Sequence, residues 1–397
     1  MRILVLQQPH SVAPFERWLH EASADVEVRI VTGEGTARAD ETIAPGVRRD
    51  VFGDYESDAT TRQVFELCAQ WRPEVVFSNS EADVLRAAEA RVLFGIGGMT
   101  SASAVLFRDK VAMKQLFSGL PAQVAPYRVP TSAEEVIDAC DELGMVVVKP
   151  RDGAGSAGVQ VFGTPEEASR FLATNPGLLG PLHRSQLILE KFVHGDVYHV
   201  DILVRDGEPI LVSPSKYLAP PHLFRQVNVG AVMTDVSSAD HGFLAAYARG
   251  LVRQVAVHQP NILHLEMYRT PGGEFVAGEV ACRGGGGLIK ESMKHTYGVD
   301  QAWAACLLAA GLLPERTFLR RTGQQSGYIL ETAHELALDP VAPPEWVALC
   351  RRKERPGTPG TSCDAGTQLV VAGDSHDQIL GRMTALNGGR TALYAGR

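Results

Sequence analysis

Cysteine is scarce in this sequence, and long apolar runs are missing from it. The six cysteines among 397 residues are widely scattered, with no C-x-x-C pair and no histidine at zinc-site spacing, so we expect reduced thiols rather than zinc ligands. No apolar run approaches the roughly 18 residues that a membrane helix needs. Residues 1–6 are too short for a signal-peptide core and predict a first strand. We therefore expect a cytoplasmic protein without a membrane partner.

Positive charge is also in deficit. The chain has 38 Lys and Arg against 46 Asp and Glu, a net charge of -8, which argues against nucleic-acid binding. Basic residues nevertheless gather near the motifs described below, and a small polyphosphate fits them better than a nucleic acid. With 45% hydrophobic and 21% charged residues, the composition is that of a globular protein, and 397 residues suggest two or three domains.

The order of patterns divides the chain into three regions. Strand-like and helix-like stretches alternate up to about residue 108, which predicts an α/β unit with a parallel sheet. From 109 the pattern becomes α+β, with helices at 109–119 and 134–143 and a series of strands from 145 to 282. A last region, 313–397, contains a Pro- and Gly-rich stretch at 351–362 that predicts a mobile loop, then a strand at 368–372 and a helix at 375–386.

A glycine-rich segment follows the apolar strand at 145–149. Gly153, Gly155 and Gly158 form a literal G-x-G-x-x-G, but the next residues, Val-Gln-Val-Phe, predict a strand rather than the helix that a dinucleotide site requires. The segment is therefore expected to be a hairpin whose backbone N–H groups can cover a polyphosphate. An ordinary hairpin is an equal alternative on this pattern alone. Lys149 favours the anion site, because a cation ending an apolar strand needs an anion beside it.

Two glutamates on neighbouring strands carry the strongest signal. A two-residue turn at Gly272 and Gly273 places Glu266 directly across from Glu279, with both on one face. Like charges at that spacing need a cation, and Mg2+ suits paired carboxylates. The same parity puts apolar residues on the other face and adds three residues to the glutamate face: His264, Ala281 and Arg283.

The alternative to a metal site is a solvated polar face with the glutamates turned toward nearby arginines. Arg283 is followed by four glycines, 284–287, which disfavours that alternative. Consecutive glycines are entropically costly, and they suit a backbone that closely approaches a ligand.

The order of these motifs resembles the ATP-grasp superfamily, and within it the biotin-carboxylase-like group that includes the L-amino acid ligases. The resemblance covers almost the whole chain. Lys110 matches the lysine of the helix-opening D-K motif, and Lys149 with the glycine hairpin is similar to the second phosphate lysine and its lid. The residues that the resemblance assigns to ATP are Lys110, Lys149, Gly153, Gly155, Ser156, Gly158, the adenine hinge Glu190, Lys191, Phe192 and Val193, and, near the ribose, His199.

The resemblance also assigns metal and substrate residues. Glu266 and Glu279 match the Mg2+ ligands, and Arg283 matches the arginine that steadies the acyl phosphate, with Lys149 as its catalytic partner. The remaining substrate residues are Gly285, Gly286, Lys216 and Arg225, the last two beside a Pro-rich loop where solvated surface charge is an equal alternative.

Two departures from the family pattern matter. Ala281 stands where the E-x-N-x-R motif has asparagine, which removes one metal ligand and leaves the number of Mg2+ ions open. Val197 replaces an acid after the hinge, so ribose contact shifts to Asp196 or His199, and a packed histidine is an equal alternative for the latter.

The resemblance implies an ADP-forming ligase that joins a small carboxylic acid, in the first instance an amino acid, to an amine through an acyl phosphate. The partners are then the two small molecules, with a homodimer as one expected assembly. The alternatives are another acceptor, as in purine-pathway or carrier-loading ligases, and a nucleotide-binding protein without turnover. The expected domains are an N-terminal unit at 1–108, an ATP-grasp domain at 109–312 with lobes at 109–185 and 186–312, and a C-terminal domain at 313–397.

Overall fold

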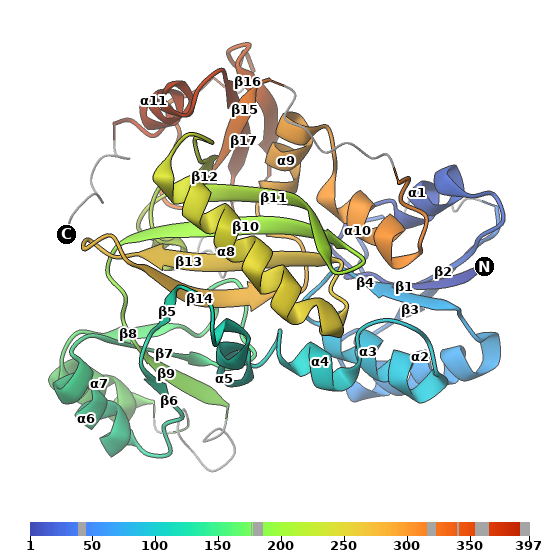
Figure 1. Ribbon diagram of the computed structural model, residues 1–397, viewed down its shortest axis with the longest axis horizontal. Coiled ribbons are helices and arrows are strands. Elements are labelled where there is room, and N and C mark those ends of the chain that lie inside the picture. The colour runs from blue at the N-terminus through green and yellow to red at the C-terminus, as the bar shows by residue number, and fades with distance from the viewer. Residues whose placement is uncertain are drawn as a thin grey trace.

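A computed structural model describes residues 1–38, 45–175, 177, 186–315, 323–339, 341–353 and 365–389 of the chain. These residues form three β-sheets, which Figure 1 shows as an N-terminal unit, a long central sheet and a small lobe. The α/β and α+β architecture predicted from the sequence is confirmed.

The N-terminal unit is a four-stranded sheet in the order β3-β2-β1-β4, with every neighbouring pair parallel. Two of its helices begin at capping side chains: Ser57 accepts from the backbone N–H of Thr60, and Thr100 accepts from that of Ser103. The elements are β1 (Arg2–Leu6), α1 (Phe15–Ala22), β2 (Glu27–Gly33), β3 (Val47–Phe52), α2 (Asp58–Trp71), β4 (Val75–Ser78), α3 (Asp83–Phe94) and α4 (Ser101–Val105).

The small lobe is an antiparallel sheet in the order β6-β9-β7-β8, covered by two helices. Strands β7 and β8 pair antiparallel, so the glycine segment between them is a hairpin, as predicted, and no dinucleotide helix follows it. The expected helix at 109–119 is shorter, because it tightens to 3-10 geometry from Lys114. The elements of the lobe are β6 (Tyr127–Arg128), α6 (Ala133–Leu143), β7 (Val146–Pro150), β8 (Gln160–Phe162), α7 (Pro165–Thr174) and β9 (Leu187–Lys191). Before them in the chain, α5 (Lys110–Met113) and η1 (Lys114–Phe117) pack against α8 (Ala239–Val255) and the central sheet.

The central sheet has nine strands in the order β16-β17-β15-β12-β11-β10-β13-β14-β5. One strand from the last region, β15, hydrogen-bonds to β12, so the sheet runs across the proposed boundary at residues 312 and 313, and the domain limits stay a proposal. The elements are β5 (Gln123–Val124), β10 (Asp196–Arg205), β11 (Glu208–Tyr217), η2 (Pro221–Leu223), β12 (Val229–Met233), α8 (Ala239–Val255), η3 (Ala256–His258), β13 (Ile262–Arg269), β14 (Phe275–Ala281), α9 (Ile289–Tyr297), α10 (Gln301–Ala309), β15 (Gln325–Leu330), β16 (Val347–Arg352), β17 (Thr367–Gly373) and α11 (His376–Leu386).

The loop expected at 351–362 begins later than predicted. Arg351 and Arg352 are the last residues of β16 and pair with β17. Residues 354–364 lie outside the described part of the chain.

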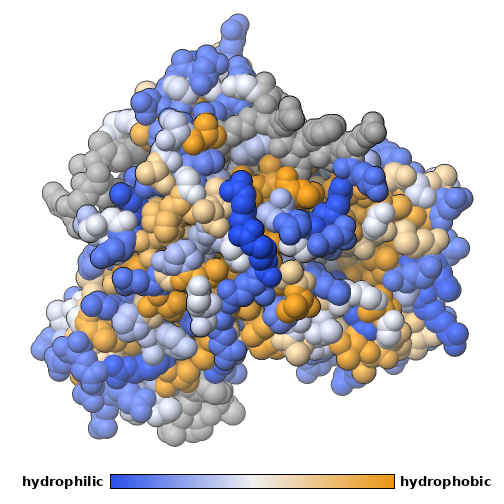
Figure 2. Space-filling view, in the orientation of Figure 1, coloured by the Kyte–Doolittle hydropathy of each residue, from blue (hydrophilic) through white to orange (hydrophobic). Residues whose placement is uncertain are grey.

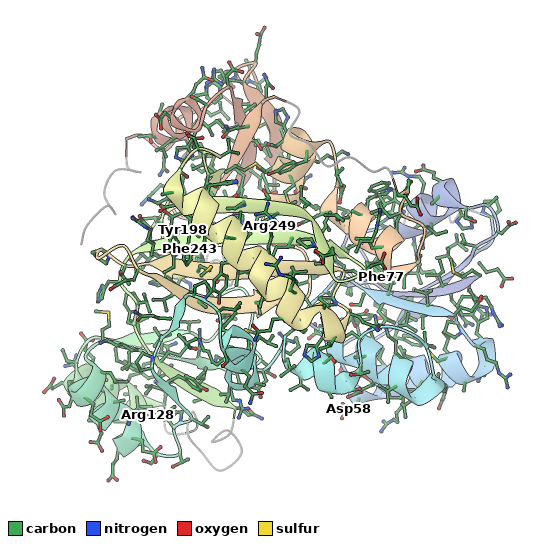
Figure 3. All side chains as sticks on the ribbon, in the orientation of Figure 1. Asp58, Phe77, Arg128, Tyr198, Phe243 and Arg249 are labelled. Carbon is green, nitrogen blue, oxygen red and sulfur yellow. The ribbon has the colours of Figure 1, made fainter. Side chains whose placement is uncertain are left out.

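Helix α8 covers one face of the central sheet. Along β10 the even-numbered residues from Tyr198 to Val204 are buried against this helix. Figure 3 shows Tyr198 and Phe243 close together there, and the ring of Phe275 joins them, stacked 4.3 Å from Phe243 and edge-on to Tyr198 at 5.8 Å. Because side chains alternate along a strand, the odd-numbered residues point to the opposite face, where the polar residues gather.

The molecular surface in the orientation of Figure 2 mixes hydrophilic and hydrophobic residues, and a strip of hydrophilic residues crosses its centre over α8. Within the described ranges, none of the helices has the length and apolar character needed to cross a membrane.

Candidate active site

A cavity of about 2660 Å3 opens between the small lobe, the polar face of the central sheet and the N-terminal unit. It brings together residues that are far apart in the sequence. The residues assigned above that line it are Lys110, Lys149, Gly153, Gly155, Ser156, Gly158, Glu190, Lys191, Phe192, Val193, Lys216, Arg225, Glu266, Glu279, Arg283, Gly285 and Gly286. His199 is the one assigned residue that does not line it.

Three lysines and two glutamates form a compact charge cluster at the base of the glycine hairpin. Nζ of Lys149 lies 2.8 Å from Oε1 of Glu279 and 3.3 Å from Oε2 of Glu190. Nζ of Lys114 lies 2.9 Å from Oε1 of Glu190, and Nζ of Lys110 lies 3.5 Å from Oε2 of Glu279. The three lysines are each at most 7% exposed, so the carboxylates are what keeps their charges tolerable in the interior.

The pKa shifts follow from this competition between burial and pairing. Burial opposes the charged form of Lys149, but Glu190 and Glu279 outweigh it and raise its pKa well above the ordinary value. Burial likewise opposes ionised Glu190 and Glu279, yet the lysines hold the pKa of each carboxyl below its usual range. Lys114 differs, since burial dominates and lowers its pKa. The two carboxylates are therefore ionised at neutral pH.

The glycine hairpin is tied to this cluster. Nζ of Lys110 donates to the backbone oxygen of Gly153 at 2.6 Å, and the backbone N–H of Lys110 donates to the oxygen of Arg151 at 2.9 Å. Gly158 has a φ of +71°, and a Cβ there would approach Pro150 to 3.0 Å, so a larger residue would strain the loop.

Glu266 and Glu279 face each other across β13 and β14, as predicted, although the turn differs from the predicted one. The strands are joined by a three-residue loop, with Thr270 bonded to Glu274, which shifts the pairing by one residue. A bulge between Glu266 and Met267 shifts it back. The bulge lies at Gly278, where a Cβ would approach the ring of Tyr268 to 2.8 Å and the backbone oxygen of Glu266 to 3.0 Å.

Arg283 is held by a residue of the N-terminal unit. Its Nε donates to Oε1 of Glu81 at 3.0 Å, and the other oxygen of Glu81 accepts from Arg108 at 2.6 Å. The backbone N–H of Gly284 donates to Oδ1 of Asn79 at 3.1 Å. The loop after β4 thus fixes the start of the glycine run. Neither Glu81 nor Asn79 was predicted from the sequence, because they lie about 200 residues away with no motif of their own.

The structure does not bring His199 to the cavity, which fits the packed-histidine alternative rather than a contact with the ribose. This side chain is 2% exposed, packs 4.9 Å from the ring of Tyr217 and donates through Nδ1 to Oδ2 of Asp201 at 2.7 Å. Helix α9 covers it, because Ile289 and Ser292 line the small pocket where it lies. Asp196, the alternative for the ribose, does line the main cavity.

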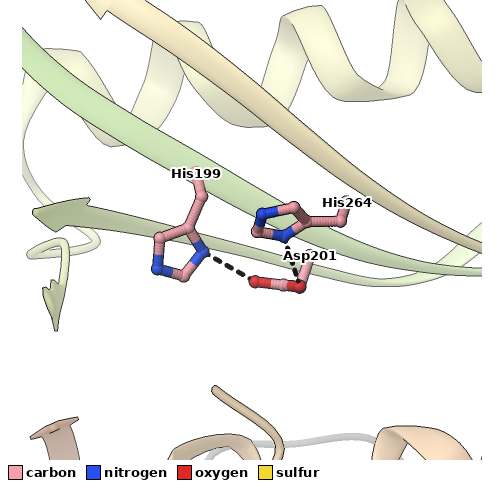
Figure 4. Close-up of side chains that lie close together, drawn as sticks. All are labelled: His199, Asp201 and His264. Atoms are coloured by element: carbon pink, nitrogen blue, oxygen red, sulfur yellow. Dashed lines mark hydrogen bonds and ion pairs between the residues drawn. The ribbon is translucent and has the colours of Figure 1, made fainter. Parts of the chain in front are cut away.

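Asp201 joins two histidines, as Figure 4 shows, and Gly285 lies close to this group. Nδ1 of His264 lies 3.0 Å from Oδ1 of Asp201, and Nε2 of His264 lies 3.7 Å from Oε1 of Glu266. Burial disfavours the charged ring, but Asp201 raises the pKa of His264 to about 9. The three polar groups lie within 4.8 Å of one another, as metal ligands would. The short contacts of both rings with Asp201 instead describe a hydrogen-bonded triad.

The two basic residues beside the Pro-rich loop have structural partners. Nζ of Lys216 lies 2.7 Å from Oδ2 of Asp196, with both side chains partly exposed, and the Arg225 guanidinium lies 5.2 Å from the ring centre of Phe224. In the segment predicted as the adenine hinge, the backbone N–H of Phe192 donates to the backbone oxygen of Met145. The ring of Phe192 lies 5.9 Å from the ring of His222.

No family model matches the chain. Solved structures match it over nearly its full length: an L-amino acid ligase from Bacillus licheniformis has a TM-score of 0.70 at 16% identity, covering 98% of this chain and 97% of that one. A carboxyaminoimidazole ribonucleotide synthase from Aspergillus clavatus, complexed with ATP, has a TM-score of 0.71 at 13% identity, covering 97% of each chain. The chain has the ATP-grasp fold.

The chain is also similar in sequence to two ligases. The L-arginine-specific L-amino acid ligase of Bacillus subtilis is 29% identical over 245 residues, which are 58% of this chain and 56% of the relative. A D-alanine–D-alanine ligase of Geobacter sulfurreducens is 31% identical over 110 residues, covering 28% of this chain and 32% of that protein. The chain thus matches little more than half the length of the first of these relatives.

Proposed function

We propose that the chain is an ATP- and Mg2+-dependent ligase that joins a small carboxylic acid, an amino acid in the simplest case, to an amine through an acyl phosphate and releases ADP and phosphate. The observation that supports this most is the convergence of Lys110, Lys149, Glu279 and Arg283 on one cavity. The activities named for its relatives, L-amino acid ligase and D-alanine–D-alanine ligase, agree with it.

The lysines of the charge cluster can exchange their carboxylate partner for another anion. Lys110 and Lys149 are paired with Glu279 in this structure, and we propose that the phosphates of ATP replace that carboxylate. The hairpin backbone would then donate to the same phosphates, while residues 190–193 and Asp196, which line the cavity, would hold the adenine and the ribose.

Glu266 and Glu279 fit Mg2+, because both carboxylates reach the cavity from one face and each side chain is nearly 30% exposed. Mg2+ bound there would neutralise charge on the transferring phosphate. Ala281 contributes no oxygen ligand from its side chain, so the number of ions stays open.

Arg283 is the residue we assign to the acyl group. In the first step a carboxylate oxygen of the acid attacks the γ-phosphorus, the bond to the ADP oxygen breaks and ADP leaves. In the second, the amine nitrogen attacks the acyl carbon, phosphate leaves with the bonding pair and the nitrogen loses a proton. The planar Arg283 guanidinium can contact two oxygens at once, which suits both the carboxylate and the intermediate.

An ADP-release assay with pairs of amino acids tests this function. We expect some pair to stimulate formation of ADP and phosphate in a Mg2+-dependent way. Release of AMP and pyrophosphate would indicate adenylation and contradict the proposal. ATP binding with no turnover on any acid would favour the non-catalytic alternative, for which Ala281 is the specific observation. A homodimer stays a prediction for light scattering to check.

A further inference from the structure

Two rows of side chains cross β10, β13 and β14 on the polar face of the central sheet. Strand register gives three residues to each row: His199, Glu266 and Glu279 in the first, and Asp201, His264 and Ala281 in the second. The proposed function uses only the two glutamates of the first row. Two side chains of the second row are polar and buried, which is costly unless they have a task.

His264 links the second row to the first. Its Nδ1 lies 3.0 Å from Oδ1 of Asp201, and because a carboxylate oxygen accepts, this ring nitrogen donates. The bond turns the other ring nitrogen, Nε2, toward Glu266, whose Oε1 lies 3.7 Å away. That contact is within ion-pair range, although it is longer than a hydrogen bond. His264 lines the main cavity, whereas Asp201 lies behind it and is 1% exposed. A line of contacts thus runs from a carboxylate outside the cavity to a proposed metal ligand.

His199 is held by the same aspartate but does not share this link. Its Nδ1 donates to Oδ2 of Asp201 at 2.7 Å, and its ring packs against Tyr217. Its Nε2 is buried and has no hydrogen-bond partner within the described ranges. His199 therefore steadies Asp201 without a hydrogen bond to Glu266.

Ala281 leaves the metal end of the second row without a ligand. It pairs with His264 across the strands and stands where the family pattern has asparagine, so its side chain offers no oxygen to an ion. His264 is the polar side chain of that row that reaches Glu266. Groups that hold a metal-binding carboxylate in place matter for the ion, since losing one typically costs about tenfold to a hundredfold in metal affinity.

We propose that Asp201 and His264 are positioning residues for the metal site: Asp201 fixes the ring of His264, and Nε2 of that ring holds Glu266 in the orientation that binds Mg2+. His264 makes up in part for the missing asparagine, because it restrains the glutamate that remains. This inference rests on the proposed function, since it takes Glu266 as a ligand of Mg2+.

Binding of Mn2+ in place of Mg2+ tests this without turnover. The full-length protein is saturated with ADP, and its Mn2+ dissociation constant is measured by electron paramagnetic resonance. His264→Asn should raise that constant about tenfold or more, because the amide can keep the bond to Asp201 but has no atom in the position of Nε2. Asp201→Asn should also raise it, because the ring then loses the acceptor that fixes it. The affinity for ADP without a metal ion, measured by calorimetry, should not change.

His199→Asn is the matched control. It makes the same substitution on the other ring held by Asp201, at an equally buried position that makes no hydrogen bond to Glu266. Both variants should lower the urea midpoint, but only His264→Asn should weaken Mn2+ binding. An equal effect of the two on Mn2+ binding, or no effect of His264→Asn, overturns the proposal and leaves a purely structural triad.

His264→Gln is the conservative variant. Its amide nitrogen can take the position of Nε2, so it should recover most of the Mn2+ affinity that His264→Asn loses. Mn2+ binding no tighter than that of His264→Asn would overturn the role given to Nε2.

Glu279→Gln separates the failure of this inference from that of the proposed function. Mn2+ binding that is lost in Glu279→Gln but unaltered in His264→Asn would keep the metal site and remove only the positioning residues. Absence of Mn2+ binding by the wild-type protein with ADP would count against the metal site itself, and the inference would fall with it.

Discussion

Nζ of Lys149 lies 2.8 Å from Oε1 of Glu279, so a phosphate lysine and a metal glutamate, as we propose them, neutralise each other in this structure. ATP and Mg2+ would replace each partner with one whose charge has the same sign. The protein would then avoid an uncompensated buried charge both before and after the nucleotide binds.

This pairing changes the expected effect of removing Glu279. The like-charge pair with Glu266 alone would favour a stability gain, but Lys149 and Lys110 would lose a partner. We expect Glu279→Gln to abolish Mg2+-dependent ADP release and to lower the free energy of unfolding by about 1–3 kcal/mol, with the fold retained. Urea unfolding and an ADP assay measure both. Glu208→Gln, at an exposed strand end, is the control. Full activity of the Glu279→Gln variant would contradict the metal role.

Lys114 is expected to be structural. It is 5% exposed and links Glu190 to the backbone oxygen of Gly278, which lies 3.2 Å away beside Glu279. Lys114→Met should lower the free energy of unfolding by about 2–4 kcal/mol, because Glu190 then keeps only Lys149. Lys149→Met should weaken ATP binding more than Lys114→Met does, as measured by calorimetry. The reverse order would move the phosphate contact to Lys114.

Gly285 leaves no room for a side chain. A Cβ there would lie 2.5 Å from Ile289 Cδ1, 2.9 Å from His264 Nδ1 and 3.0 Å from Asp201 Oδ1. We expect Gly285→Ala to lower Tm by several degrees and to reduce ADP release, because it displaces the run that follows Arg283. Gly381→Ala in α11 meets nothing within 4 Å and should instead stabilise by up to about 1 kcal/mol. Equal melting behaviour of the two variants would refute this crowding.

Stability should fall between pH 6.5 and 9 because of His264. Asp201 raises the pKa of this ring to about 9, against roughly 6.5 in the unfolded chain, so the folded state holds the proton more tightly. The contribution is full below pH 6.5 and is lost as the pH rises through 9. Asp201→Asn should flatten this part of the profile, measured by urea midpoints at several pH values. An unaltered slope in the variant would contradict the assignment.

The sequence was sufficient for the sheet types, the glycine hairpin and the glutamate pair. The pair was correct although the two-residue turn was not, since the three-residue loop and the bulge at Gly278 offset each other. Strand alternation preserves the face of a residue whenever two such shifts cancel. Short-range pattern thus predicted the chemistry of the hairpin better than its geometry.

Contacts between distant segments could not be predicted in the same way. Glu81 and Arg283 are 202 residues apart, and nothing in the stretch around Glu81 marks it as a partner. His199, in contrast, was predicted as a site residue but lies away from the cavity. The resemblance assigned it to the ribose side, with a packed histidine as the alternative, and only the path of the chain after Arg283 shows that α9 covers it.

The most direct test of the central claim is interception of the acyl phosphate by hydroxylamine in place of the amine. With an acid that stimulates ADP release, a hydroxamate of that acid should form and should require both ATP and Mg2+. Arg283→Lys should lower its yield sharply, because a point charge cannot replace the two-pronged contact, and Arg283→Met should lower it further with little change in ATP affinity. An acid that clearly stimulates ADP release without any hydroxamate would contradict the acyl-phosphate mechanism.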